Sequence, residues 1–241
     1  MKKNKKGFTL VELIVVMAMM GVIMTGVLMI MKPTNTLYNK VSDSRNQEAG
    51  CIALSEAISN QIKYSRYTYV YSTTKSSPPD YSTISKELYS HVIILDNSAV
   101  RTGAKKNVLG SFTYADYNGS SAFSNSKNLV ENATLDNYNY RLTVQGKKVG
   151  SATNNNNYIG IDFYSYPQQW NGSSYVADES APFKMSKNIT FTNMNRRAML
   201  STKAVGGISI EESSKGANEI VYIFYSDPDT TATTTTTTAT P

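Results

Sequence analysis

A carboxylate beside a long apolar run is the feature of this sequence that most needs a chemical explanation. Glu12 directly precedes Leu13–Met31, a run of 19 residues without a charge. A carboxylate at the centre of a membrane helix costs about 2.5–3.5 kcal/mol, and such a residue marks a functional site by default. An ionised carboxylate in an apolar environment is stable when it is paired, or when it reaches back to the polar headgroups at the interface.

The apolar run is long enough to cross a bilayer as a helix, which needs about 20 residues. Before it, residues 2–6 carry four lysines, which the positive-inside rule places on the cytoplasmic side. An ordinary secretory signal has an apolar core of only about 7–15 residues and then a small-residue cleavage site. Here the longer run is followed by Lys32-Pro33. A plain membrane anchor explains the lysines but leaves Glu12 unexplained.

The segment Gly7-Phe8-Thr9-Leu10-Val11-Glu12 resembles the prepilin peptidase site of type IV pilins, a class III signal peptide that is cut before the apolar run. In that family the leader ends in Gly, the mature chain begins with Phe or Met, and Glu is the fifth mature residue. This resemblance implies cleavage after Gly7 and N-methylation of Phe8. It also implies that Glu12 is neutralised in the filament by the N-terminal amine of a neighbouring subunit.

The same resemblance implies four segments: a leader (1–7), a membrane and assembly helix (8–31), a head (32–229) and a Thr-rich tail (230–241). The tail has no pattern able to bury a core, so we expect it to be disordered. The precursor is expected in the cytoplasmic membrane with its head outside, and the assembled protein in an extracellular pilus. The implied partners are other pilin subunits, the prepilin peptidase, the platform protein and the assembly ATPase.

Helical spacing continues beyond the apolar run. Pro33 either bends the helix or marks its exit from the membrane. We expect the helix to end near Tyr64–Tyr67. Its predicted core face consists of apolar residues at steps of three and four: Leu37, Val41, Ala49, Ile52, Leu54, Ile58 and Ile62.

From Tyr67 onward, short β-rich runs alternate with Ser, Asn, Gly and Pro. We predict strands at 88–95, 108–114, 138–144, 158–164, 189–192, 207–211 and 219–225. The last two are expected to form a hairpin through the turn at 215–218. A helix followed by strands predicts an α+β fold, with a long N-terminal helix packed on a mainly antiparallel β-sheet head. Type IV pilins share this architecture.

The charge and cysteine content agree with an exported protein. Removing residues 1–7, which hold four lysines and no acid, lowers the formal net charge from +6 to +2. The basic balance therefore indicates topology and argues against a nucleic-acid partner. Cys51 is the single cysteine, so no intramolecular disulfide can form, unlike in many Gram-negative pilins. This departure favours a Gram-positive host, and the helical spacing of Cys51 predicts a small buried hydrophobe.

Nothing in the sequence predicts an enzyme, a metal site or a cofactor. His91 is the single histidine and falls in a predicted strand, and no catalytic or phosphate-binding motif surrounds it or Cys51. Asp227-Pro228-Asp229 is expected to be an exposed terminal loop rather than a weak calcium contact. Trp170, with Tyr166 and Tyr175 nearby, predicts an aromatic loop in which a ligand groove is the weaker alternative to ordinary packing.

The predicted function is a structural subunit of a type IV pilus. A head of nearly 200 residues favours a minor pilin over a major one. One alternative is a pseudopilin of a type II secretion or competence system, which would share the processing. The other is a single-pass, membrane-anchored surface binding protein that never polymerises.

Overall fold

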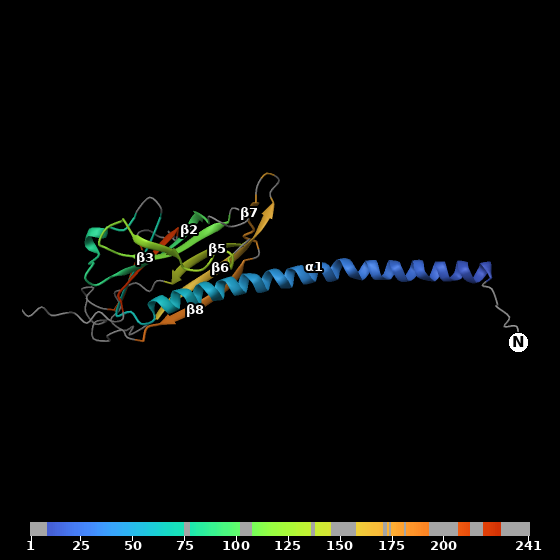
Figure 1. Cartoon of the computed structure of the whole chain (residues 1–241), viewed down its shortest axis with the longest axis horizontal. Helices are drawn as coiled ribbons and strands as arrows, with labels where there is room; N and C mark the ends of the chain where they lie inside the picture. Colours follow the sequence, from blue (N-terminus) through green and yellow to red (C-terminus); the bar gives the residue numbers. More distant parts are fainter. Residues whose placement is uncertain are drawn as a thin grey trace, which may run out of the picture. The chain divides into compact units, whose positions relative to one another are not determined.

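The computed structural model contains two compact units, Met1–Asn46 and Gln47–Pro241, which are described separately below. The structure describes residues 9–74, 78–101, 108–135, 138–145, 158–170, 173, 175–180, 182–192, 207–212 and 219–227. In these residues a helix precedes all of the strands, and the strands pair mainly antiparallel. The α+β fold predicted from the sequence is therefore confirmed (Figure 1).

Helix α1 (Leu10–Ile62) has 53 residues and continues through Pro33 without interruption. Proline has no N–H to donate to the carbonyl four residues earlier. At the next residue, the hydroxyl of Thr34 donates to the carbonyl oxygen of Ile30 at 2.8 Å. The helix ends at Ile62, slightly earlier than predicted, because the backbone N–H and the hydroxyl of Ser65 both donate to the Ile62 carbonyl.

The buried face of α1 begins only at Gln47. Its members recur at steps of one, three and four residues, as expected for one side of a helix: Gln47, Gly50, Cys51, Leu54, Ser55, Ile58 and Ile62. The prediction was right for Leu54, Ile58 and Ile62, and for the burial of Cys51. It was wrong for Leu37, Val41, Ala49 and Ile52, which are exposed because none of them belongs to the face that meets the head core.

The larger sheet has six strands in the order β4-β3-β2-β10-β1-β9. Neighbours are antiparallel except for β1 and β9, which run parallel. The strands are β1 (Tyr67–Thr73), β2 (His91–Val100), β3 (Leu109–Asp116), β4 (Ser124–Asn128), β9 (Gly207–Glu212) and β10 (Ile220–Tyr225). Strands β1 and β4 were not among the predicted strands.

The predicted hairpin between β9 and β10 is wrong. Strand β1 lies between them, with Thr68 opposite both Ile208 of β9 and Tyr225 of β10. The physical reason is that β10 carries apolar residues on both faces, and a central position lets the sheet bury all six of its side chains. The proposed turn at 215–218 lies outside the described residues.

The second sheet is built around the long strand β6 (Tyr158–Trp170). Strands β5 (Tyr138–Gln145) and β8 (Phe183–Thr190) flank its first part, and β7 (Tyr175–Ala177) pairs with its last three residues. The predicted strand at 189–192 therefore covers only the end of β8. Trp170 is the last residue of β6 and pairs with Tyr175 across a hairpin, so the predicted aromatic loop begins within paired strands.

Side chains join the two sheets along β5. The amide of Asn97 in β2 donates to the Leu142 carbonyl and accepts from the Leu142 N–H, both at 2.8 Å. The Leu109 N–H donates to Asn139 Oδ1 at 2.8 Å, and the Arg101 guanidinium donates to the Tyr138 carbonyl. The bonds from Asn97 and Arg101 satisfy backbone groups on an edge of β5 that no strand pairs among the described residues, and the Asn139 side chain satisfies the N–H of Leu109 in β3.

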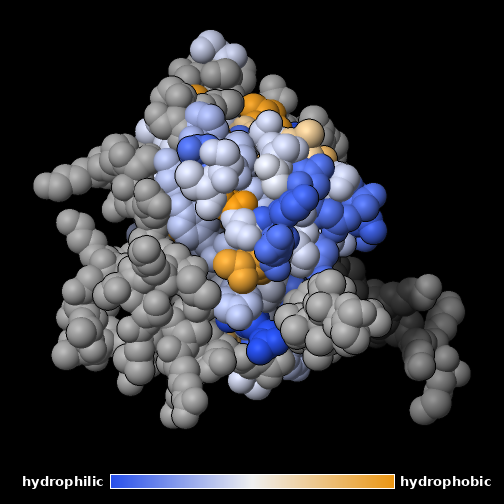
Figure 2. All heavy atoms as spheres, turned by 90° about the vertical axis from the view of Figure 1, so that its left-hand side faces the viewer, coloured by the Kyte–Doolittle hydropathy of each residue, from blue (hydrophilic) through white to orange (hydrophobic). Residues whose placement is uncertain are grey.

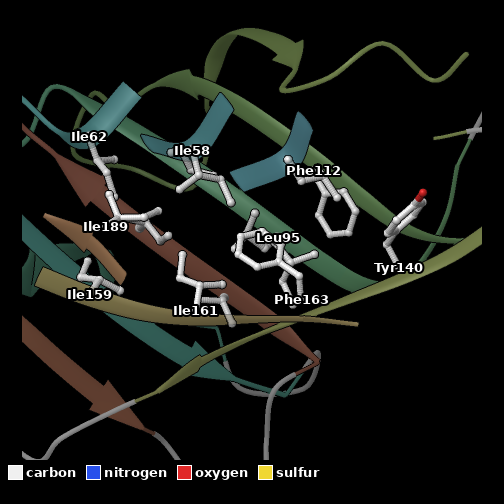
Figure 3. Close-up of a cluster of buried hydrophobic side chains, with 14 of the residues drawn as sticks. Ile58, Ile62, Leu95, Phe112, Tyr140, Ile159, Ile161, Phe163 and Ile189 are labelled. Atoms are coloured by element: carbon white, nitrogen blue, oxygen red, sulfur yellow. The ribbon is translucent and has the colours of Figure 1, made fainter. Parts of the chain in front are cut away.

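One core lies between the C-terminal part of α1 and the two sheets (Figure 3). Ile58 and Ile62 of α1 face Ile159 and Ile161 of β6, and Ile189 of β8 lies beside them. Full burial of one such side chain contributes about 1.5–3 kcal/mol. A second cluster covers the opposite face of the six-stranded sheet, where Tyr222 and Phe224 of β10 meet residues of the 81–89 segment and Phe123.

Candidate functional site

The first turn of α1 holds the carboxylate that the sequence singled out. Glu12 Oε2 accepts from the backbone N–H of Thr9 at 2.9 Å and from its hydroxyl at 3.0 Å. In return, Thr9 Oγ1 accepts from the Glu12 N–H at 3.3 Å. This reciprocal pattern is a capping box, which satisfies N–H groups left without partners at a helix start. The sequence Thr9-Leu10-Val11-Glu12 carries the capping-box signature, but Glu12 was predicted to pair in the filament or to reach the interface headgroups, and not to cap the helix.

The surface that follows Glu12 is apolar on every side. From Leu10 to Met31 the large apolar side chains are between 47% and 76% exposed, so nothing in the described chain covers them. Among the described residues, α1 is the one helix long and apolar enough to cross a membrane, by its length and composition. A helix that is apolar all round must be covered by lipid or by other protein. Gly21 and Gly26 lie in this surface, and a Cβ at either would meet nothing within 4 Å.

Two of the predicted site residues, Gly7 and Phe8, lie outside the described residues. Of the three predicted residues, the structure therefore describes Glu12, which lies at the start of the apolar helix. After a cut behind Gly7, Thr9 would be the second residue of the mature chain. Its N–H and hydroxyl would remain available, so the capping box is compatible with processing.

The head contains a titratable cluster that the sequence did not predict. His91 Nδ1 lies 3.0 Å from Asp116 Oδ1, and His91 Nε2 lies 3.0 Å from Asp227 Oδ1. The Asn125 amide, and after it the positive charge available at His91, hold the pKa of Asp116 below its ordinary value. Asp227 is thus tied to β2 rather than being the purely exposed loop residue that was expected. The two carboxylates bond different ring nitrogens of His91, an arrangement that suits a structural link between their two segments.

Cys51 and His91 do not form a catalytic pair. Cys51 is fully buried in the core, where burial raises the pKa of its thiol to about 12, whereas both ring nitrogens of His91 face aspartates. A buried thiol with a raised pKa is a poor nucleophile. Within the described parts of the chain, no three His, Cys, Asp or Glu residues are grouped so that they could hold a metal ion.

A carboxylate in the first turn of an exposed apolar helix, followed by an α+β head, agrees with the arrangement that the resemblance to type IV pilins implied. The family model described as "Prokaryotic N-terminal methylation motif" matches residues 2–28. This match includes Gly7, Phe8 and Glu12, and it extends through most of the exposed apolar surface. The N-terminal segment of the chain therefore carries the N-terminal methylation motif of type IV pilins.

Two solved structures of the PilB minor pilin from Streptococcus sanguinis, one of them a point mutant, are similar to the chain. The mutant has a TM-score of 0.36 and 10% identity, and it is matched over 73% of this chain and 33% of its own. The other has a TM-score of 0.37 and 9% identity, with 79% and 35% covered. The chain thus spans about a third of the length of these structures. No curated protein matches it.

Proposed function

We propose that the chain is the precursor of a type IV pilus subunit, and specifically of a minor pilin. The observation that carries this proposal is the methylation motif at residues 2–28, joined without a break to an apolar helix that the described chain leaves exposed. The four segments expected from the sequence correspond to successive roles. The leader (1–7) orients the precursor, 8–31 anchors and assembles it, and 32–229 is the head, followed by the tail.

Processing would convert the anchor into an assembly element. The lysines of the leader hold the N-terminus in the cytoplasm while the apolar helix spans the bilayer. Prepilin peptidase then cuts after Gly7, and the new amine of Phe8 is methylated. Because Phe8 then begins the chain, its positive charge lies four residues from Glu12, close to where a neighbouring subunit presents its own carboxylate.

The apolar surface explains why subunits would associate in one register. Lipid and neighbouring helices are similarly apolar, so the hydrophobic effect alone discriminates little between them. An ionised Glu12 in that environment is destabilising unless a cation pairs with it. The amine of Phe8 on a neighbouring subunit supplies that cation, and the pairing would exchange the capping bonds to Thr9 for an intersubunit bond. The platform protein and the assembly ATPase would drive extraction from the membrane.

The hydrophilic surface of the head favours a position at the filament surface. Figure 2 shows a face of the described head on which hydrophilic residues predominate and hydrophobic residues are scattered, as expected for a region in contact with water. The size of the head, residues 32–229, is the reason for preferring a minor pilin. A pseudopilin would share the N-terminal chemistry, so the two differ in what the assembled filament does.

Processing is tested by the mass of the chain in cells that contain prepilin peptidase. The wild-type chain is expected to lose residues 1–7 and gain one methyl group, and a Gly7→Val variant is expected to keep the full precursor mass. Gly26→Val is the matched control, because a Cβ there meets nothing within 4 Å and the residue lies beyond the cut. A wild-type chain that keeps its leader would contradict processing.

Assembly is tested on filaments sheared from cells. Immunogold labelling against the head is expected to mark sheared filaments of the wild type and to be absent for Gly7→Val. Labelling confined to the cell envelope, with the leader removed, would favour a pseudopilin. Labelling confined to the envelope with the leader retained would favour a non-polymerising anchored protein.

A further inference from the structure

A cavity of about 320 Å³ lies beside the second sheet of the head. Its wall includes Asn139 and Arg141 of β5, Tyr166 of β6, Glu179 after β7, and Glu219 before β10. All of these residues belong to the Gln47–Pro241 unit. The cavity is at the lower end of the range of about 300–1,000 Å³ that small-molecule sites occupy. It has no part in the assembly chemistry of α1.

The charged groups of the wall have mixed signs. One guanidinium, from Arg141, and two carboxylates, from Glu179 and Glu219, line the same space. A ligand with a strong charge of either sign would therefore meet a group of the same sign. A hydroxyl group both donates and accepts hydrogen bonds, so it can bond a guanidinium and a carboxylate equally well. The wall is matched to a neutral ligand that carries several hydroxyl groups.

A buried hydrogen-bond donor in the wall, the side-chain amide of Asn139, also favours a ligand that carries hydroxyl groups. Asn139 is 4% exposed, and its Oδ1 accepts from the Leu109 N–H at 2.8 Å. Its Nδ2 is buried and donates to no atom in the described part of the chain. A buried donor without an acceptor costs about 1–3 kcal/mol. A hydroxyl or carbonyl oxygen of a ligand that reached Asn139 would remove that cost.

Two tyrosines line the cavity, Tyr140 and Tyr166, and the second of them lies beside Tyr164, which is outside the wall. The rings of Tyr164 and Tyr166, two residues apart on β6, are nearly parallel at 10°, with 6.4 Å between their centroids. Burial raises the pKa of the Tyr166 phenol, so it stays neutral and can donate. Strand β6 pairs with β5 as far as Pro167 and with β7 from Gln168 onward, and Tyr166 and Glu179 both line the cavity. A flat apolar face thus adjoins the polar groups.

We propose that this cavity binds a neutral carbohydrate of one or two rings. The C–H face of a pyranose would pack on Tyr166, while its hydroxyl groups bond Arg141, Glu179 and the Asn139 amide. The cavity volume limits the buried part of the ligand to that size. The head would then contribute a sugar-binding site of its own, whatever assembly the helix enters.

The test uses the full chain in phospholipid micelles, because maltoside detergents carry sugar headgroups that would compete. Saturation-transfer NMR is recorded with N-acetylglucosamine, methyl galactoside, lactose and maltose, and with sialyllactose as an anionic probe. At least one neutral sugar is expected to receive saturation on the protons of one ring face. Tyr166→Ala is expected to weaken that binding by roughly tenfold, which corresponds to about 1.4 kcal/mol.

Tyr158→Ala is the matched control, because Tyr158 lies on the same strand and does not line the cavity. Glu179→Gln keeps the size of its side chain and is expected to weaken binding, which guards against a folding defect in Tyr166→Ala. No transfer to any neutral sugar, stronger binding of sialyllactose, or equal losses in Tyr158→Ala and Tyr166→Ala would each overturn the proposal. Tyr166→Ala chains are expected to be processed and assembled normally. Failure of the sugar-binding proposal would therefore leave the proposed filament role untouched.

Discussion

Gly50 of α1 lies directly against the phenol of Tyr140 in β5. A Cβ added at Gly50 would be 1.9 Å from the Tyr140 oxygen and 2.6 Å from the adjoining ring carbon. Tyr140 is 1% exposed and cannot move aside into solvent. The helix can therefore approach the second sheet this closely only because residue 50 has no side chain.

Replacing Gly50 by Ala is expected to destabilise the head. Overpacking a core costs about 1–3 kcal/mol, while Ala gains roughly 1 kcal/mol over Gly inside a helix. The expected net loss is up to about 2 kcal/mol, or a fall in Tm of roughly 2–4 °C for each kcal/mol. Thermal unfolding followed by near-UV circular dichroism measures it.

Gly26→Ala is the control for this substitution, since a Cβ there has nothing within 4 Å. It should leave the unfolding temperature of the head unchanged. Adding Tyr140→Phe to Gly50→Ala removes the atom closest to the new methyl group and should recover part of the loss. Equal effects at both glycines would contradict the close contact with Tyr140.

The side chain of Asn97 is expected to hold the two sheets together. Asn97→Ala would leave the N–H and the carbonyl of Leu142 without the partners that lie 2.8 Å from each. Each backbone group left unsatisfied costs about 1–3 kcal/mol when it is buried. We expect a loss of at least about 1 kcal/mol in the free energy of unfolding. Asn128→Ala on the exposed strand β4 should have no measurable effect, and a similar loss there would contradict the bridge.

The stability of the head is expected to fall in alkali. Burial raises the pKa of the Cys51 thiol from its ordinary 9.0 to about 12 and that of the Tyr89 phenol from 10.0 to about 12. Between these values the unfolded chain has lost protons that the folded chain retains, so the free energy of unfolding decreases as pH rises. Denaturant unfolding at steps between pH 9 and 12 measures the decrease.

Cys51→Ala should reduce that slope without removing it, because Tyr89 still titrates. At neutral pH the thiol should react with a maleimide only after the head is unfolded. Rapid labelling of the folded chain would contradict the burial of Cys51.

His91 and Asp227 are expected to be coupled only weakly. Their side chains are 26% and 49% exposed, and exposed ion pairs contribute about 0.2–1 kcal/mol. A double-mutant cycle with His91→Gln and Asp227→Asn should give a coupling energy in that range. A coupling of zero would contradict the contact.

Two roles of Glu12 can be separated by substitution. Glu12→Gln keeps a side chain that accepts from Thr9 but loses the charge, so it should be processed and should fail to form filaments. Thr9→Ala loses the two capping bonds of the Thr9 hydroxyl, worth about 1 kcal/mol at a helix start, and keeps the charge, so it should be processed and assembled. Mass spectrometry and electron microscopy of sheared filaments give the two measurements. Filaments of normal length from Glu12→Gln would contradict the pairing with an amine.

The sequence predictions of buried residues were accurate only where the apolar face of the helix packs against the head core. The spacing of Cys51, Leu54, Ile58 and Ile62 predicted a buried face, and that face meets the head core. Leu37 and Val41 follow a similar spacing and are exposed. Periodicity indicates that a helix has an apolar side, but it does not say what covers that side.

Strand prediction failed for two different reasons. Strands β4 and most of β8 are exposed on both sides, so they carry little of the alternation that marks a strand. Strand β1 has that alternation in Tyr67, Tyr69 and Tyr71, but it follows the predicted end of the helix so closely that no strand was predicted there. The pairing of β10 with β1, rather than with β9, joins segments about 150 residues apart and has no local signature.

The sequence by itself determined the N-terminal methylation motif, the burial of Cys51 and the α+β order. Each of these depends on residues that are close together in the chain, where spacing alone fixes their geometry. Only the tertiary structure decided that Gly50 meets Tyr140, that His91 lies between Asp116 and Asp227, and that Arg141, Tyr166 and Glu179 line one cavity. Those contacts depend on strand register and on the packing of one sheet against another, which bring together residues from distant segments.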